Sequence, residues 1–298
     1  MSRSESAERE AEAHPRPAIQ LHTVRDIDES LPETIRRVGD AKFEGVEFAG
    51  AFLKADPHAV RKALDETGLT PVAAHVDLQA LEGDLEPIID RCRRVGSDHL
   101  VIPHLGAGYF RTTTHVDALA RRLEGLAKQL DAYGFQLSYH TSKHPFLPLL
   151  DRYGLGFPAN LPSPGVVWEL MAEAIDLTVR GADRDVATTG FGRLVSRTDH
   201  LTFEVDVGWA AAAGYDPVDV FDLVGDRLSL IHIADVARTS RFPPEFRSVM
   251  PGEGILDLER VLRASRKTGV DWLIFEDDHP VDPEAAVETG RAALDQFN

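Results

Sequence analysis

The sequence predicts a closed (β/α)₈ TIM barrel, because short apolar runs alternate with amphipathic stretches along most of its 298 residues. Continuous apolar runs are typical of strands that are buried on both faces, as in a parallel sheet. Eight strand-and-helix units over about 250 residues are the usual size of such a barrel. A doubly wound open sheet is the rival arrangement, and it needs a glycine-rich turn after its first strand. The chain reads HTVRD there, without a glycine, so the barrel is the predicted fold.

The eight expected strands are short and rich in Val, Ile, Leu or Phe. They are Ala18–Leu21, Gly45–Phe48, Pro71–Ala74, His99–Ile102, Gln136–Tyr139, Leu201–Val205, Leu228–Ile231 and Trp272–Phe275. Between them lie helix signals, such as an Asp or Thr at the start and a Gly at the end. The expected helices are Leu31–Ala41, Asp56–Gly68, Asp84–Gly96, Thr114–Gly134, Ser163–Ala174, Pro217–Val224, Leu258–Thr268 and Pro283–Phe297.

The chain divides into an N-terminal extension and one domain. Residues 1–17 are polar and lack an apolar core, so we expect a disordered extension and not a secretory signal. Residues 18–298 are expected to form a single barrel domain. An insertion is expected at 141–200, where 60 residues separate strands five and six and many are Pro or Gly. A lid or an oligomer contact is one hypothesis for this segment, and a passive surface insertion is the alternative.

The composition excludes several classes of protein. A net charge of −17 opposes binding to nucleic acid, and no apolar run is long enough to cross a membrane. A single cysteine, Cys92, excludes disulfide frameworks and thiolate metal clusters and indicates the cytosol. Only 6 of the 32 basic residues are Lys, which is typical of proteins adapted to high salt. A GC-rich genome that favours Arg and Asp codons is the alternative explanation.

Histidine, aspartate or glutamate occurs at or just after the end of every expected strand. These residues are His22, Glu47, His75, His104, His140, Asp206, His232 and Glu276. A lone histidine is more often an ordinary packed residue, but catalytic groups of a barrel gather at these strand ends. Imidazole and carboxylate ligands together suit a divalent cation. Such an ion would polarise a carbonyl and an adjacent hydroxyl of a sugar and so stabilise an enediolate.

The segment EVDVGWAAAAGYDPVDVFDLVGDRLSLIHIAD, Glu204 to Asp235, resembles the sugar phosphate isomerase/epimerase family of xylose isomerase-like barrels. The segments Pro251–Glu276, IQLHTVRD and GVEFAG are similar to further strands and turns of that family. The resemblance implies a barrel with one divalent metal ion, with Mn²⁺ expected and Co²⁺, Mg²⁺ or Zn²⁺ as alternatives. It also implies isomerase, epimerase or dehydratase chemistry on sugars or cyclitols.

Carried over by position, the resemblance implies that Asp206, His232 and Glu276 are metal ligands. Several members of the family have a Glu as the fourth ligand at strand five, where this chain reads YHTSKHPF. His140 is therefore the expected fourth ligand, with His144 as a substitute. This departure argues against a symmetric mechanism in which two glutamates exchange protons on opposite faces. The strand-seven motif also lacks the family's Lys, since Ala234 precedes Asp235.

Further residues are expected to act on the substrate. We expect Glu276 to move the substrate proton, His140 to act beside it, and His75 and His104 to serve as acid–base groups. The substrate-binding candidates are Glu47, Arg25 and Trp209. Their alternatives are an internal ion pair for the glutamate, a solvated loop for the arginine and core packing for the tryptophan.

The function expected from these residues is a metal-dependent isomerase or epimerase of a sugar or keto-sugar, phosphorylated or not. A lyase similar to inosose dehydratase and a non-catalytic sugar-binding barrel are the alternatives. The DNA-repair enzymes of the superfamily fit poorly, because the chain is acidic. The expected partner is a small sugar, with no nucleic acid and no membrane; a homo-oligomer stays open.

Overall fold

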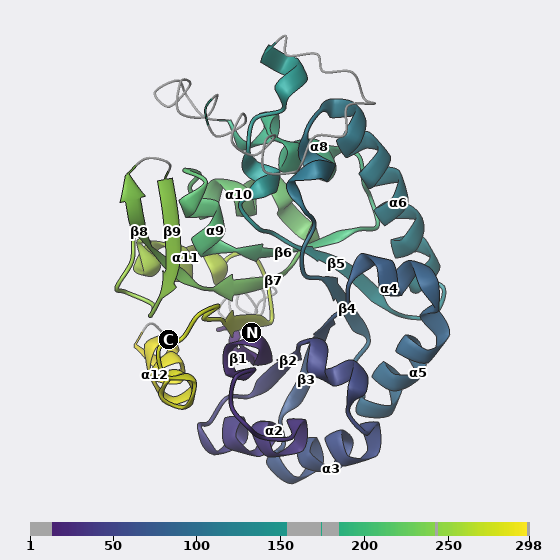
Figure 1. The fold of residues 1–298 in the computed structure, drawn as a ribbon, viewed down its shortest axis with the longest axis vertical. Coiled ribbons are helices and arrows are strands. Elements are labelled where there is room, and N and C mark those ends of the chain that lie inside the picture. The colour runs from purple at the N-terminus through teal and green to yellow at the C-terminus, as the bar shows by residue number, and fades with distance from the viewer. Residues whose placement is uncertain (1–13, 154–173, 175–184, 242–243, 297–298) are drawn as a thin grey trace, which may run out of the picture.

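A computed structural model describes residues 14–153, 174, 185–241 and 244–296. Among them, eight parallel strands close into a barrel in the order β1-β10-β7-β6-β5-β4-β3-β2 (Figure 1). The strands are β1 (Arg16–Gln20), β2 (Gly45–Phe48), β3 (Thr70–His75), β4 (His99–Ile102), β5 (Gln136–His140), β6 (Thr202–Asp206), β7 (Leu228–Ile233) and β10 (Trp272–Phe275). Every predicted strand is present within two residues of its expected bounds, and the predicted barrel is confirmed.

Helices cover the outside of the barrel (Figure 1). They are α2 (Leu31–Asp40), α3 (Pro57–Thr67), α4 (Leu78–Gly83), α5 (Leu85–Val95), α6 (Thr113–Asp131), α8 (Gly190–Ser196), α9 (Val207–Ala212), α10 (Pro217–Val224), α11 (Leu258–Ser265) and α12 (Pro283–Asp295). Short 3₁₀ turns join them: η1 (Leu21–Val24), η2 (Gly50–Lys54), η3 (Ala107–Phe110), η4 (His144–Phe146), η5 (Leu150–Tyr153), η6 (Val186–Thr188) and η7 (Gly225–Arg227).

The predicted caps are confirmed at both ends of α3. Asp56 accepts a hydrogen bond from the backbone N–H of His58 at the start of α3, and the helix ends at Gly68, whose φ of 74° favours glycine. The α6 boundary differs from the prediction. Thr112, and not Thr114, caps this helix by accepting from the backbone N–H of His115, so the helix begins slightly earlier than expected.

Apolar side chains close the N-terminal end of the barrel interior. A buried cluster there consists of Ala18, Val72, Ala73, Val101, Leu230, Trp272 and Ile274. Gly45 belongs to the same layer, because a Cβ atom at this position would lie 2.6 Å from Val72 and 2.7 Å from Trp272. The guanidinium of Arg16 lies 3.8 Å from the ring centroid of Trp272. With this end filled, the polar side chains of the barrel interior lie toward the C-terminal ends of the strands.

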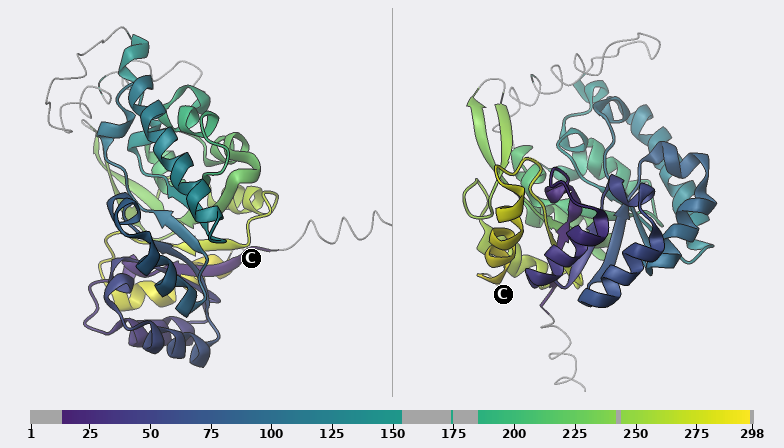
Figure 2. Two further views of the ribbon diagram at one scale, coloured as in Figure 1. Left: turned by 90° about the vertical axis from the view of Figure 1, so that its right-hand side faces the viewer. Right: turned by 60° about the horizontal axis from the view of Figure 1, so that its bottom comes forward.

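A two-stranded antiparallel ribbon follows β7 and was not predicted. It consists of β8 (Asp235–Arg241) and β9 (Pro244–Val249), and it projects from the barrel (Figures 1 and 2). Asp235 anchors its base. The carboxylate of Asp235 accepts hydrogen bonds from the backbone N–H groups of Val236, Gly252, Gly254 and Leu256 at 2.8–3.2 Å.

Part of the predicted organisation lies outside the described residues. The helix expected at Ser163–Ala174 and most of the extension at 1–17 belong to this part, so both stay predictions. Strand β1 begins at Arg16, two residues inside the expected extension. None of the helices that the structure describes is long and apolar enough to cross a lipid bilayer.

Candidate metal centre

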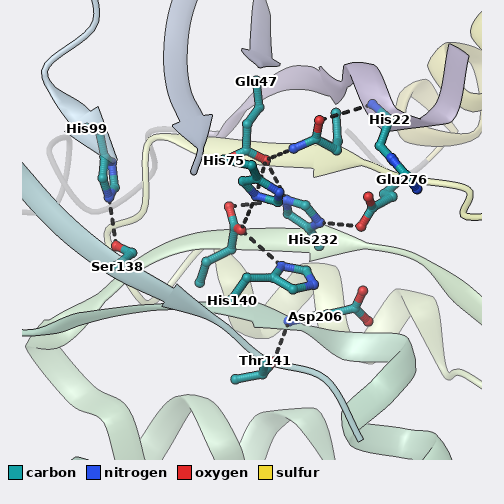
Figure 3. Close-up of polar contacts among 12 residues, drawn as sticks. His22, Glu47, His75, His99, Ser138, His140, Thr141, Asp206, His232 and Glu276 are labelled. Carbon is teal, nitrogen blue, oxygen red and sulfur yellow. Dashed lines mark hydrogen bonds and ion pairs between the residues drawn. The ribbon is translucent and has the colours of Figure 1, made fainter. Parts of the chain in front are cut away.

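The four predicted metal ligands meet at one point of the barrel. His140 ends β5, Asp206 ends β6, His232 lies in β7, and Glu276 directly follows β10. These strands are consecutive in the sheet, and one nitrogen or oxygen of each side chain lies within 4.8 Å of those of the other three (Figure 3). All four residues are buried. Two imidazoles and two carboxylates in this arrangement offer the donor set of a divalent cation.

The two carboxylate oxygens of Asp206 have different surroundings. Oδ1 caps α9 by accepting a hydrogen bond of 2.8 Å from the backbone N–H of Trp209, in the first turn of that helix. Oδ2 is buried and has no hydrogen-bond partner. Burial raises the pKa of Asp206 well above its usual range, although the nearby His232 opposes this shift. An unpartnered carboxylate oxygen is costly in a protein interior, and a bound cation would supply the missing partner.

His232 and Glu276 form a buried pair beside Asp206. Nδ1 of His232 lies 2.9 Å from Oε2 of Glu276. Burial opposes the charge on both groups. The charge of His232 nevertheless lowers the pKa of Glu276 to about 2, and the charges of Glu204, Glu276 and Glu47 raise the pKa of His232 well above its usual value. The glutamate is therefore ionised at neutral pH, as a metal ligand must be. The residues present thus fit the metal that the sequence predicts.

A deeper layer of the barrel contains two more carboxylates and one more imidazole. Glu204 precedes Asp206 by two residues on β6, so both side chains point into the barrel. Burial would lower the pKa of His75, but the charges of Glu47 and Glu204 raise it to about 10. Burial would raise the pKa of Glu204, but His232 and His140 lower it well below its usual value. Sequence reasoning missed Glu204, although the alternation of side chains along the segment TFEVD gave the signal.

A cavity of about 580 Å³ opens above the four ligands. His140 and Glu276 reach it, and the rest of its wall comes from segments that follow the barrel strands. Its lining residues are His22, Ala49, Gly50, Leu53, His75, Asp77, Pro103, His104, His140, Ser142, Lys143, His144, Trp209, Glu276, Asp278 and His279. The volume and the polar lining suit a small hydrophilic molecule.

The remaining predicted residues fall into two groups. His75, His104, His144 and Trp209 line the cavity, as a role in binding or catalysis requires. Glu47 does not: it is fully buried and accepts hydrogen bonds of 2.8 Å from Gln20 and His232, which favours the internal ion pair. Arg25 is not part of the cavity wall either, because its guanidinium donates to the backbone carbonyls of His22 and Asp278.

Several cavity residues were missed because they lie beyond the strand ends. Asp77, Lys143, Asp278 and His279 belong to this group. Burial raises the pKa of Asp278, and the neighbouring charge of Glu276 adds to the shift. The run EDDH that begins at Glu276 was the available signal, since loops after barrel strands often carry the substrate-binding residues.

Comparison with known families agrees with this geometry. Residues 189–297, which include three of the four ligands, match the family model described as the xylose isomerase-like TIM barrel. The chain folds as a closed TIM barrel, and its C-terminal part is similar to the xylose isomerase-like family. No curated protein matches its sequence.

Solved structures share the xylose isomerase-like barrel over nearly the whole chain. One is a sugar phosphate isomerase/epimerase from Parabacteroides distasonis, with 15% identity, a TM-score of 0.70 and coverage of 94% of this chain and 93% of that one. Another is the IolI protein with a bound zinc atom, with 15% identity, a TM-score of 0.66 and coverage of 95% and 97%. A third is the probable 3-DHS dehydratase AsbF from Bacillus anthracis, with 12% identity, a TM-score of 0.65 and coverage of 95% and 100%.

Proposed function

We propose that this protein is a divalent-metal-dependent isomerase or epimerase that acts on a sugar or keto-sugar. The observation that carries the proposal is the convergence of His140, Asp206, His232 and Glu276 directly below a cavity of sugar size. Two of the similar structures support the proposal. One is named as a sugar phosphate isomerase/epimerase, and the other contains a bound zinc atom. Mn²⁺ remains the metal that we propose, with Zn²⁺, Co²⁺ and Mg²⁺ as alternatives. We further propose that the protein acts in the cytosol.

Three of the cavity residues have a part in the proposed reaction. A divalent ion, when bound, would polarise a carbonyl and an adjacent hydroxyl of the substrate. Glu276 is ionised and reaches the cavity, so it can accept the proton from the carbon beside the carbonyl. His104 lines the same cavity and can donate a proton to the carbonyl oxygen as Glu276 takes the proton from carbon. In the second half of the reaction, Glu276 returns its proton to a carbon and His104 regains its own from a hydroxyl. Trp209 supplies an apolar wall against the sugar ring.

A dehydratase acting on a keto-sugar or keto-cyclitol is the second candidate. Among the four proposed ligands, Glu276 is the carboxylate that lines the cavity, and the fourth ligand on β5 is an imidazole. This arrangement favours proton removal by a single base on one face, which suffices for a dehydration, whereas an epimerisation also needs a proton delivered to the opposite face. One of the similar structures is named as a probable dehydratase.

Metal analysis of the purified protein tests the metal centre. We expect about one divalent ion per chain in the wild type and a sharp loss in Asp206→Ala and Glu276→Ala, because each variant removes a charged ligand. Asp222→Ala on the exposed face of α10 is the matched control and should retain the ion. Full occupancy in the double variant of Asp206 and Glu276 would contradict the proposal.

Deuterium exchange followed by NMR tests the chemistry. With candidate keto-sugars in D₂O, we expect exchange at the carbon beside the ketone, with one face strongly preferred. His140→Glu should retain metal and shift the exchange toward both faces, because it places a second carboxylate opposite the first. An absorbance scan separates the two candidate reactions, since dehydration yields a conjugated product. Absence of exchange with every sugar, despite bound metal, would favour a binding barrel instead.

A further inference from the structure

Glu204 lies directly behind the imidazoles of the candidate metal centre. Its Oε2 atom is 3.0 Å from Nδ1 of His140 and 3.0 Å from Nε2 of His75, and its Oε1 atom is 3.1 Å from Nε2 of His232. The side chain is fully buried, and its position on β6 is one layer deeper than Asp206. A single carboxylate therefore contacts both imidazoles of the proposed ligand set.

For His140, the contact with Glu204 indicates which ring nitrogen can bind a metal ion. A neutral imidazole has one N–H and one lone pair, and a hydrogen bond to a carboxylate holds the proton on the nitrogen that makes it. In His140 this nitrogen is Nδ1, so Nε2 carries the lone pair. Figure 3 shows that this second nitrogen faces the side on which Asp206 and Glu276 lie.

His232 has the reverse arrangement. Its Nε2 lies 2.8 Å from Oε2 of Glu47 and faces the deeper layer, while Nδ1 faces Glu276 in the ligand set. With a metal ion bound, each ring would be neutral and keep its one proton on the nitrogen that faces the deeper carboxylates. The two lone pairs would then point to the same place, next to the unpartnered Oδ2 atom of Asp206. The carboxylates of Glu47 and Glu204 thus contact the imidazoles of His140 and His232 on one side, and the other proposed ligands lie on the opposite side.

A second metal ion in the deeper layer is the rival explanation. His75, His140, Glu204 and His232 also bring ligand atoms within 4.8 Å of one another. However, two of these imidazoles belong to both groups, and a neutral ring has only one lone pair to give. Both groups reach the cavity, but the upper group does so with a carboxylate, Glu276, whereas the one carboxylate of the deeper group, Glu204, is fully enclosed. The upper group is therefore the ligand set, and the deeper group orients it.

We propose that Glu204 is a positioning residue that fixes His140 as a metal ligand through Nε2, while Glu47 fixes His232 as a ligand through Nδ1. This inference rests on the proposed function, since it requires the metal centre. Carboxylates that accept from the second nitrogen of a metal-bound imidazole strengthen binding, and their loss weakens it by about 10- to 100-fold.

The test compares Glu204→Gln with Glu44→Gln, a matched change at an exposed glutamate just before β2. Metal affinity is measured by competition between the protein and a chelator for Zn²⁺, and Co²⁺ absorption reports the geometry of the site. We expect Glu204→Gln to bind Zn²⁺ about 10- to 100-fold more weakly, still to one ion per chain, with a changed Co²⁺ spectrum. The Glu44→Gln variant should match the wild type in both measurements.

A measurement on the wild-type protein tests the same inference without a variant, so it remains informative if Glu204→Gln does not fold. ¹⁵N NMR of the Zn²⁺-loaded protein should show the His140 proton on Nδ1 and the His232 proton on Nε2. The opposite tautomers, or an unchanged affinity and Co²⁺ spectrum in Glu204→Gln, would overturn the inference and leave the proposed function intact. Two ions in the wild type and one in the variant would also overturn it, because Glu204 would then be a ligand. A wild type that binds no metal would overturn both proposals.

Discussion

Glu124, on α6, holds the turn that leads into β6. Its carboxylate accepts hydrogen bonds from the backbone N–H groups of Asp199 (2.9 Å) and His200 (3.0 Å), and it also contacts the His200 ring and Lys128. Burial alone would raise the pKa of Glu124, but these donors lower it to about 2. The ionised form therefore stabilises the folded protein.

Glu124→Gln should accordingly lower the free energy of unfolding at pH 7 by about 1–2 kcal/mol. A lowered pKa in the folded state gives stability that is complete above the unfolded pKa of about 4.3 and is lost as the pH falls toward 2. The gap between wild type and variant should thus close below about pH 4 in urea titrations. Glu86→Gln, at an exposed position of α5, is the control. A gap that is constant from pH 7 to pH 3 would show that the charge of Glu124 contributes nothing.

The residues of the metal centre could be predicted to different degrees. His140, Asp206, His232 and Glu276 could be identified because each directly ends or follows an apolar run, and their convergence in the structure needs only the barrel. Their role as ligands stays a prediction. Glu204 was missed because a glutamate inside an apolar strand attracts attention only when the alternation of side chains is followed.

At the scale of elements, Asp235 is the main support of the segment between β9 and α11. Four backbone N–H groups donate to its carboxylate, and a Cβ atom at Gly254 would lie 2.1 Å from its Oδ1 atom. The side chain is fully buried. Its replacement would leave these donors without an acceptor in a site closed to water.

Asp235→Ala should therefore lower the free energy of unfolding by about 2–4 kcal/mol. Hydrogen exchange should also become faster at Gly252, Gly254 and Leu256, while the amides of β2 on the other side of the barrel change little. Asp222→Ala, at an exposed position of α10, should leave both quantities within error of the wild type. Equal stability of Asp235→Ala and Asp222→Ala would rule out this role.

The unpredicted elements share a physical cause. The barrel strands could be located because they are buried on both faces and therefore apolar throughout. The ribbon of β8 and β9 reads DVARTSRFPPEFRSV, with charged residues and two prolines, and only its base is buried. Its strands pair with each other and not with the barrel. They therefore lack the continuous apolar run by which the barrel strands could be recognised. The short helices α4, α8 and α9 were missed because six or seven residues show little periodicity.

At the scale of the molecule, the net charge of −17 predicts a strong effect of salt on stability. If the acidic surface is an adaptation to high salt, screening should relieve its self-repulsion, and the melting temperature should rise steeply from low salt to molar KCl. Differential scanning fluorimetry across that range measures the effect. Sucrose at matched viscosity controls for solvent effects other than screening. A melting temperature that is flat or falls with KCl would indicate an ordinary acidic protein.

The pairing of β1 with β10 determines when the metal centre can form during synthesis. A nascent chain emerges from the ribosome with β5, β6 and β7 well before β10, so three of the four proposed ligands first stand on an open sheet. Glu276 follows the strand that closes the barrel, and it therefore arrives last. If the proposed ion is held by all four side chains, it can bind only after closure, so metal loading would be the final event of maturation and not the nucleus of folding.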